Sequence, residues 1–78
     1  MIGNVVYIIV QYLIREGDRT ISSVHATFDG AYERIHRLAE MERNNGYEVS
    51  FTKDGGIEVR TGGKVCYEFK VHTRTIQE

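Results

Sequence analysis

Residues 5–14 form an apolar run that would occupy both faces of any strand it adopts. A strand covered on only one side normally alternates apolar and polar residues, because successive side chains point to opposite faces of the sheet. In this run one alternating set is wholly apolar, and the other is interrupted only by Gln11. The chain has one plausible helix, which can cover only one face of a sheet. The second apolar set must therefore meet a twin subunit, a different partner or water.

The length of 78 residues allows one domain with one small core. A chain of this size buries only about 60% of its unfolded surface, so association is a plausible source of further burial. Cys66 has no second cysteine to pair with, which favours a reducing cytoplasmic location. No signal-peptide pattern is present, and the apolar run is about half the ~20 residues that a membrane-spanning helix needs. We therefore expect no membrane association.

The charges are balanced, with ten Lys and Arg residues against eleven Asp and Glu residues, for a net charge of −1. Proteins that bind duplex DNA usually carry a basic excess or stripe, because phosphate neutralisation supplies most of their affinity. A DNA mimic would need a strongly acidic surface. The balance argues mildly against both classes and leaves a protein partner open.

The remaining sequence shows one segment with the 3.6-residue period of a helix and several with the two-residue period of strands. Apolar residues at Ala31, Ile35, Leu38 and Ala39 form one stripe, which predicts a helix from residue 30 to about residue 44. Asp29 is the preferred N-cap, with Thr27 as the competing cap, and Gly46 or Asn45 suits the left-handed position after the helix. Strands are predicted at residues 5–14, 20–27, 47–52, 57–60 and 65–72, joined by glycine-containing turns where two strands are adjacent.

These elements predict an α+β domain spanning residues 1–78, in the order ββαβββ. We expect an antiparallel sheet of about five strands with one helix packed on one face, and a frayed tail at about residues 73–78. The first strand should lie inside the sheet, between the second strand and the last. The expected core comprises Val6, Ile8 and Val10 or their alternates, with Ala31, Ile35, Leu38, Val49, Phe51, Val59, Tyr67 and Phe69.

No pattern of residues predicts catalysis, a metal or a cofactor. Cys66 and His72 lie six residues apart on one strand, roughly 20 Å when extended, which is too far to share an ion. His25 and His36 fall on different elements. The glycine pairs at 55–56 and 62–63 separate two strands instead of leading into a helix, so they favour hairpin turns over a phosphate loop. We expect a protein that is not an enzyme.

Nucleic-acid binding is the main alternative to protein binding. Residues 63–69 have a faint likeness to the strand signature of RNA-recognition domains, but the order of elements differs from that fold. Tyr7 and Tyr12 are better candidates for free aromatic side chains, although their neighbours are aliphatic. Three helix arginines cluster, interleaved with Glu33, Glu40 and Glu42.

The first half of the chain resembles a recurrent group of short phage proteins. An apolar strand, a turn and a second strand lead into a helix through the step from Phe28 to Ala31. This order is similar to that of accessory proteins of phages and other mobile elements, anti-CRISPR proteins among them. The resemblance implies an inhibitor that evades host defence, acting in the host cytoplasm.

These arguments together predict a small non-enzymatic interaction protein that binds and blocks a larger target, either a protein or a protein–nucleic-acid complex. A nucleic-acid-binding regulator is the alternative. We expect a homodimer, whose self-association residues are Val5, Tyr7, Ile9, Tyr12 and Leu13. The residues expected to bind an outside partner are Asp18, Arg34, Arg37, Arg43 and Asp54.

Overall fold

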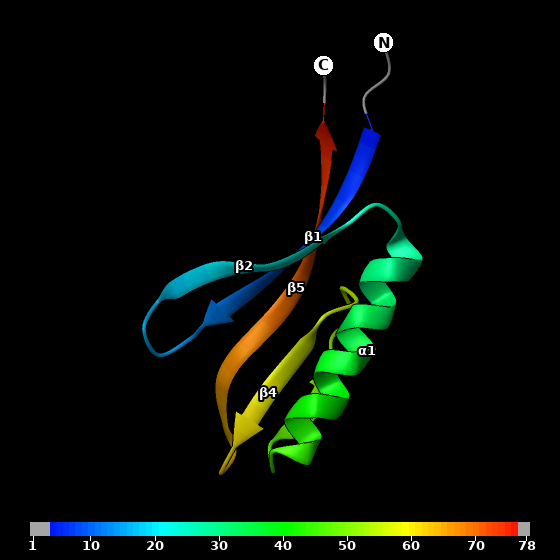
Figure 1. Cartoon of the computed structure of the whole chain (residues 1–78). Coiled ribbons are helices and arrows are strands. Elements are labelled where there is room, and N and C mark those ends of the chain that lie inside the picture. Colours follow the sequence, from blue (N-terminus) through cyan, green and yellow to red (C-terminus); the bar gives the residue numbers. More distant parts are fainter. Residues whose placement is uncertain (1–3, 77–78) are drawn as a thin grey trace.

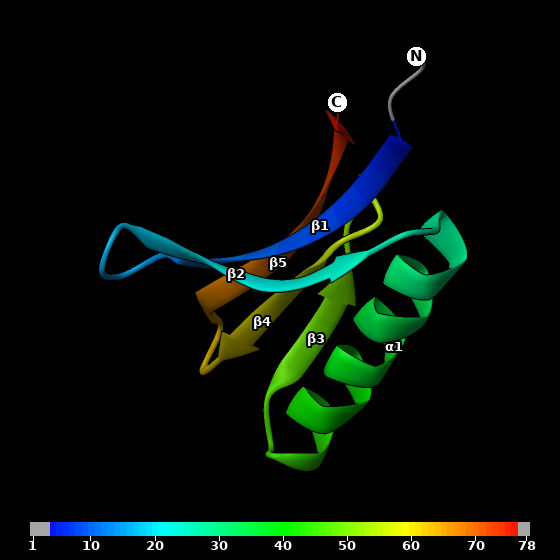
Figure 2. The same cartoon turned by 45° about the horizontal axis from the view of Figure 1, so that its top comes forward.

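The computed structural model describes residues 4–76 and confirms the predicted α+β class and order of elements (Figure 1). The elements are β1 (Asn4–Leu13), β2 (Asp18–His25), α1 (Phe28–Asn44), β3 (Glu48–Phe51), β4 (Ile57–Thr61) and β5 (Lys64–Ile76). The β1–β2 hairpin projects away from α1, while β2 leads back to the start of the helix (Figure 2).

The five strands form one antiparallel sheet in the order β2-β1-β5-β4-β3, with β1 between β2 and β5 as predicted. β1 and β5 pair along ten residues, from Asn4 opposite Ile76 to Leu13 opposite Tyr67. The prediction of a frayed tail is therefore wrong for residues 73–76. They extend β5 because β1 offers them a full ladder of backbone partners. Residues 77 and 78 lie outside the described part of the chain.

Each of two strands carries one residue without a partner in the ladder, which is a β-bulge. In β2, Ser22 is the extra residue, because Ile9 pairs with Ser23 and Val10 pairs with Ile21. In β5, Cys66 is the extra residue between Val65 and Tyr67. A bulge exchanges the two faces for all residues beyond it, so both sites change which side chains share a face.

The two ends of α1 are capped by its own flanking residues. Thr27, and not Asp29, is the N-cap: its side-chain oxygen accepts a hydrogen bond of 3.0 Å from the backbone N–H of Gly30. Asp29 lies within the first turn, where its charge still favours the positive end of the helix. At the other end Gly46 takes the left-handed conformation (φ 91°). The N–H group of Gly46 donates a hydrogen bond to the carbonyl of Arg43, and that of Tyr47 donates to the carbonyl of Glu42. This pair of hydrogen bonds ends the helix.

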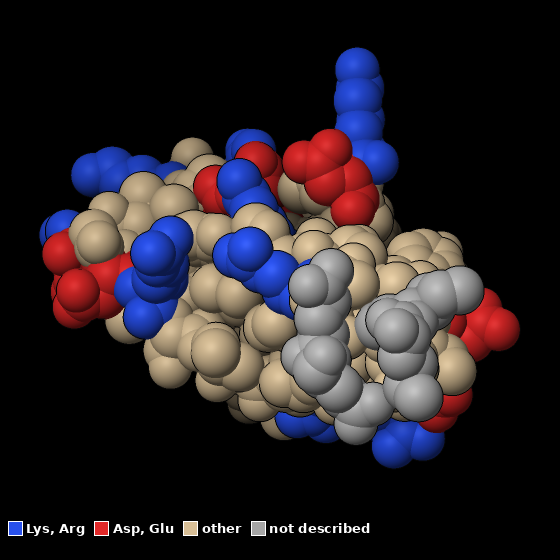
Figure 3. Space-filling model, turned by 90° about the horizontal axis from the view of Figure 1, so that it is seen from above, with Lys and Arg blue, Asp and Glu red and all other residues tan. Residues whose placement is uncertain are grey.

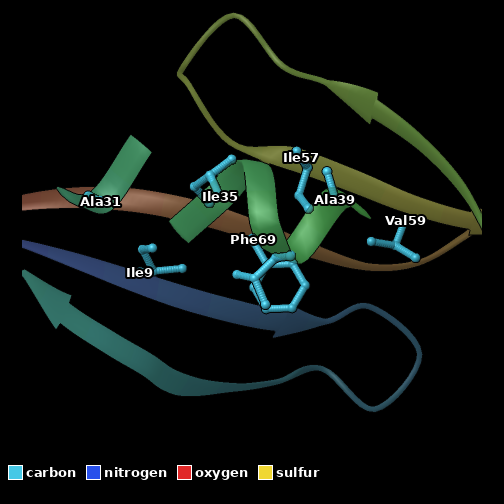
Figure 4. Close-up of a cluster of buried hydrophobic side chains, with 8 residues drawn as sticks. Ile9, Ala31, Ile35, Ala39, Ile57, Val59 and Phe69 are labelled. Carbon is cyan, nitrogen blue, oxygen red and sulfur yellow. The ribbon is translucent and has the colours of Figure 1, made fainter. Parts of the chain in front are cut away.

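The core lies between α1 and one face of the sheet (Figure 4). The helix contributes its predicted stripe, and the sheet contributes Ile9, Ile57, Val59 and Phe69, all less than 5% exposed. The residue that β1 buries is Ile9, from the alternate set and not from Val6, Ile8 and Val10. Val49 and Tyr67 are half-buried against the core as expected, but Phe51 is 44% exposed and lies outside it.

Candidate binding surface

The face of the sheet opposite α1 is not covered by any element in the described residues 4–76, and we call it the open face (Figures 1 and 2). On β1 it carries Ile8 and Val10, since Ile9 between them points to the helix. Their partners on β2 are Val24 and Ile21. These two are 57% and 64% exposed, so an aliphatic surface spans the two strands.

A hollow of about 380 Å³ lies in the open face over β2, β1 and β5. Aliphatic side chains form its floor and polar or charged side chains surround them. The lining residues are Ile8, Val10, Tyr12, Arg19, Thr20, Ile21, His72 and Arg74.

Tyr12 forms one wall of this hollow because its ring leans along the sheet. Its own partner across the ladder is Glu68, yet its hydroxyl lies 2.8 Å from Nε2 of His72, within hydrogen-bonding distance. The ammonium group of Lys70 lies 5.3 Å from the centre of the ring, a cation–π contact. The tyrosine is thus held from two sides and stays over β5.

Charge is distributed unevenly over the open face. Towards β4 the charges neutralise one another, because Arg60 pairs with Glu58 at 2.6 Å and Lys70 with Glu68 at 3.7 Å. The hydrogen bond to Glu58, with its charge, raises the pKa of Arg60. Around the hollow, Arg19 and Arg74 take part in none of the ion pairs among residues 4–76. The part of the open face with the aliphatic floor is therefore flanked by positive charge.

A second surface feature runs along the flank of α1 that faces β3. Five rings follow one another, and we call them the aromatic ridge: Tyr7, Phe28, Tyr32, His36 and Phe51. Neighbouring ring centres lie 4.5 to 5.9 Å apart. Phe28, Tyr32 and Phe51 are 44–52% exposed. This row explains why Phe51 lies outside the core: its ring packs against His36 of the helix flank.

The five residues predicted for self-association do not share a face. Ile9 is fully buried against the helix, so the prediction is wrong for this residue. Tyr7 packs against Phe28 on the same side of the sheet. Val5 and Leu13 belong to this helix-facing set as well, although Val5 is 41% exposed near the end of the strand. Only Tyr12 lies on the open face. The physical reason is that α1 covers the set containing Ile9 and leaves the other set free.

The five residues predicted to bind a partner are also dispersed. Asp18 is exposed at the tip of the β1–β2 hairpin, and Asp54 is exposed in the turn between β3 and β4. Arg34 and Arg37 line the same two hollows on α1, where Arg37 forms an ion pair with Glu33 at 3.0 Å. Arg43 lies on the other flank, 5.8 Å above the ring of Phe51. The structure brings only Arg34 and Arg37 together.

Sequence reasoning missed the residues that surround the hollow on β2 and β5. Arg19 lies just before the expected strand of residues 20–27 and Ile21 lies within it, while His72 and Arg74 fall in or beside the tail that was expected to fray. The signal that could have found them was the predicted position of β1 between β2 and β5. That order alone places the three strands side by side.

Three further features of the described residues concern metal binding, the single cysteine and membrane spans. Within residues 4–76 no group of three or more His, Cys, Asp or Glu side chains could hold a metal ion. Cys66 is half-buried, and its Sγ lies 3.8 Å from the carbonyl oxygen of Lys64. No helix in this part of the chain is both long and apolar enough to span a membrane.

Comparisons with protein-family models, with curated proteins and with solved structures found no match to this chain. The resemblance to phage accessory proteins therefore stays a prediction.

Proposed function

We propose that this protein is a non-enzymatic interaction module that binds and blocks a larger protein, with the open face as its docking surface. The observation that carries the proposal is the continuous aliphatic surface formed by Ile8 and Val10 with the exposed Ile21 and Val24. Burying an exposed aliphatic side chain of this size is worth about 1.5–3 kcal/mol. A partner that covers the surface gains this energy several times over.

The area of the face indicates how far such a partner must extend. Three strands of about ten residues, at ~3.4 Å per residue and ~4.8 Å between strands, present a flat area of roughly 500 Å². A stable interface buries about 800 Å² on each partner. Contact must therefore continue beyond the hollow, and the adjoining hollow beside Leu13 and Asp18 offers such a continuation. This would bring the predicted Asp18 into the interface.

The nature of the target is supported only by the resemblance. Short phage proteins of the kind described above inhibit host or antiviral machinery, which would make the target a host protein or a protein–nucleic-acid complex. The small size of the chain suits a blocking role, since a module of 9.0 kDa can occlude a surface without catalysing anything.

The test is an affinity capture from the natural host that compares surface variants after nuclease treatment. The double variant Ile21→Thr with Val24→Thr keeps β-branched residues in the strand and removes the aliphatic surface. Met41→Gln is the matched control, because Met41 is 51% exposed on α1, away from the open face. We expect a protein captured by the wild type and by the control to be lost with the double variant. An identical set of proteins from all three would contradict the proposal.

A second copy of the chain is the alternative occupant. β2 lies at the edge of the sheet with Ile21 exposed, so two copies could join these edges or faces. Light scattering at micromolar concentration then gives about twice 9.0 kDa, and Ile21→Glu returns the mass to that of one chain. Tyr7 is unsuitable for this test because it packs against Phe28. A monomer in the wild type would exclude the dimer.

Direct nucleic-acid binding is the other candidate function, favoured by one observation: Tyr12, Lys70, Arg19 and Arg74 lie on or beside an exposed sheet face. Against it, Lys and Arg are interspersed with Asp and Glu on the side shown in Figure 3. We expect non-specific binding no tighter than about 10⁻⁴ M at physiological salt, falling steeply as salt rises. Micromolar binding to DNA or RNA at that salt, lost when Arg19 and Arg74 are replaced by glutamine, would favour this function instead.

A further inference from the structure

We propose that the hollow of the open face binds an extended acidic–apolar segment of the partner protein, with aliphatic side chains at its centre and a carboxylate at each end. The inference rests on the proposed function and adds the chemistry of the partner. It follows from the order of side chains along β1, from one end of the hollow to the other.

The centre of the hollow is aliphatic. Ile8 and Val10 form its floor, and Ile21, paired with Val10, forms the side on β2. None of these three side chains carries a polar group, so they favour contact with aliphatic side chains over charged or hydrated ones. The middle of the segment must therefore be apolar.

The ends of the hollow are cationic. Arg19 pairs with Tyr12 and Arg74 pairs with Val6, so the two arginines mark positions six residues apart along β1. Both are exposed and line the hollow, and neither joins an ion pair among the described residues. A guanidinium group binds a carboxylate through two parallel hydrogen bonds. The positions of the two arginines thus match two carboxylates six residues apart in an extended chain.

Among the described residues 4–76, no Asp or Glu lines the hollow, so no carboxylate of these residues competes for the two arginines there. Glu68 lies on the same face but pairs with Lys70 at 3.7 Å. Asp18 lies beyond Arg19 in the adjoining hollow. Since no carboxylate of the described residues completes the site, we assign that charge to the partner.

The same charges disfavour the other occupants. If a second copy docked its hollow onto this one, Arg19 and Arg74 would face the same cationic groups of the twin. A nucleic acid would supply the negative charge, but its bases stack on aromatic rings and not on an aliphatic floor. An acidic–apolar segment satisfies both the floor and the ends.

The experiment titrates the full chain, labelled with ¹⁵N, with the peptide Glu-Ser-Leu-Ser-Leu-Ser-Glu, acetylated and amidated at its ends. In an extended conformation its glutamates and leucines lie on one face, in the order of the side chains in the hollow. We expect chemical-shift changes at amides of β2, β1 and β5 around the hollow. Peptides with lysine in place of glutamate, or serine in place of leucine, should bind at least fivefold more weakly.

Variants of the chain complete the test. Replacing Arg19 and Arg74 together by glutamine should weaken binding of the first peptide at least fivefold. The matched control, Arg34→Gln with Arg37→Gln on α1, removes the same charge elsewhere and should leave binding unchanged. Equal binding of the lysine peptide, shift changes confined to α1, or tighter binding of an eight-residue oligothymidine at the hollow would each overturn the inference.

The outcomes also separate this inference from the proposed function. If capture of the host protein depends on Ile21 and Val24 but not on Arg19 and Arg74, the function stands and the acidic–apolar partner is rejected. If capture is indifferent to Ile21 and Val24 while the peptide still binds the hollow, the site is real and the proposed function fails.

Discussion

The hydroxyl of Tyr12 and Nε2 of His72 lie 2.8 Å apart across β1 and β5, although 60 residues separate them in the sequence. This hydrogen bond joins β1, whose apolar run is the clearest feature of the sequence, to the C-terminal half of β5. It also holds the ring of Tyr12 as a wall of the hollow. The open face is therefore shaped by a polar contact as well as by its aliphatic floor.

The first prediction concerns this contact. Tyr12→Phe removes the hydroxyl and should lower the free energy of unfolding by about 0.5–1.5 kcal/mol, the usual net worth of such a bond. Urea denaturation measures the change. Tyr32→Phe is the control, because the Tyr32 hydroxyl has no hydrogen-bond partner among the described residues, and it should change stability by less than about 0.5 kcal/mol. Equal losses in both variants would contradict the assigned role of the Tyr12 hydroxyl.

The second prediction concerns the hydroxyl of Tyr67, which donates a 2.5 Å hydrogen bond to Glu42 and so ties β5 to α1. At neutral pH, Tyr67→Phe should lower the free energy of unfolding by about 1–2 kcal/mol, because the acceptor is charged. Burial, followed by the bond to Glu42, raises the pKa of Tyr67 above its ordinary value. The folded chain therefore resists ionisation of this residue more than the unfolded chain does.

The pH dependence follows from that shift. The unfolded chain ionises tyrosine near pH 10, so the contribution of Tyr67 is complete below about pH 10 and is lost as the pH rises towards the higher folded value. Wild-type stability should fall above pH 10, and Tyr67→Phe should fall less steeply. Denaturation series between pH 7 and pH 11 measure both slopes. Parallel curves of unfolding free energy against pH for the wild type and Tyr67→Phe would contradict the prediction.

The third prediction concerns Gly56, which is buried beside the backbone of β5. A Cβ atom there would overlap the carbonyl oxygen of Phe69 and lie 3.2 Å from its carbonyl carbon. Backbone cannot move aside as a side chain can, so Gly56→Ala should cost about 2–3 kcal/mol or more. Thermal unfolding measures the loss. Gly17→Asn is the control, because nothing lies within 4 Å of the added atom and asparagine tolerates its φ of 71°. A stable Gly56→Ala protein would show that the contact is looser than described.

The fourth prediction is that Cys66 has no chemical role. It is the extra residue of the bulge in β5 and is half-buried, with its Sγ 3.8 Å from the carbonyl oxygen of Lys64. Cys66→Ser should therefore change stability by at most about 1 kcal/mol and leave partner capture intact. Loss of capture in a folded Cys66→Ser protein, verified by circular dichroism, would revive an enzymatic or metal-binding function.

The helix and the turns could be predicted from sequence because they depend on neighbours along the chain. The stripe from Ala31 to Ala39 needs only the helical period, and Gly46 needs only the end of that stripe. The N-cap was missed because Thr27 and Asp29 both suit the position, and the hydrogen bond to Gly30 decides between them.

The candidate site could be predicted only in part. The apolar run of β1 showed that one face of a strand would be left without a helix, and it also indicated the neighbours of β1. It could not identify the residues that flank the run on β2 and β5. Arg19 and Arg74 become neighbours of one hollow only when both strands are paired with β1.

The sequence by itself therefore determined the elements, their order and the existence of a free apolar face. The tertiary structure decided which set of β1 side chains became that face, because both sets are apolar and an alternating period cannot distinguish them. The bulge at Ser22 decided the rest. Ile21 and Val24 would point to opposite faces of a regular strand, and the extra residue between them places both on the open face. A bulge is a property of two paired strands, and it exists only once they have met.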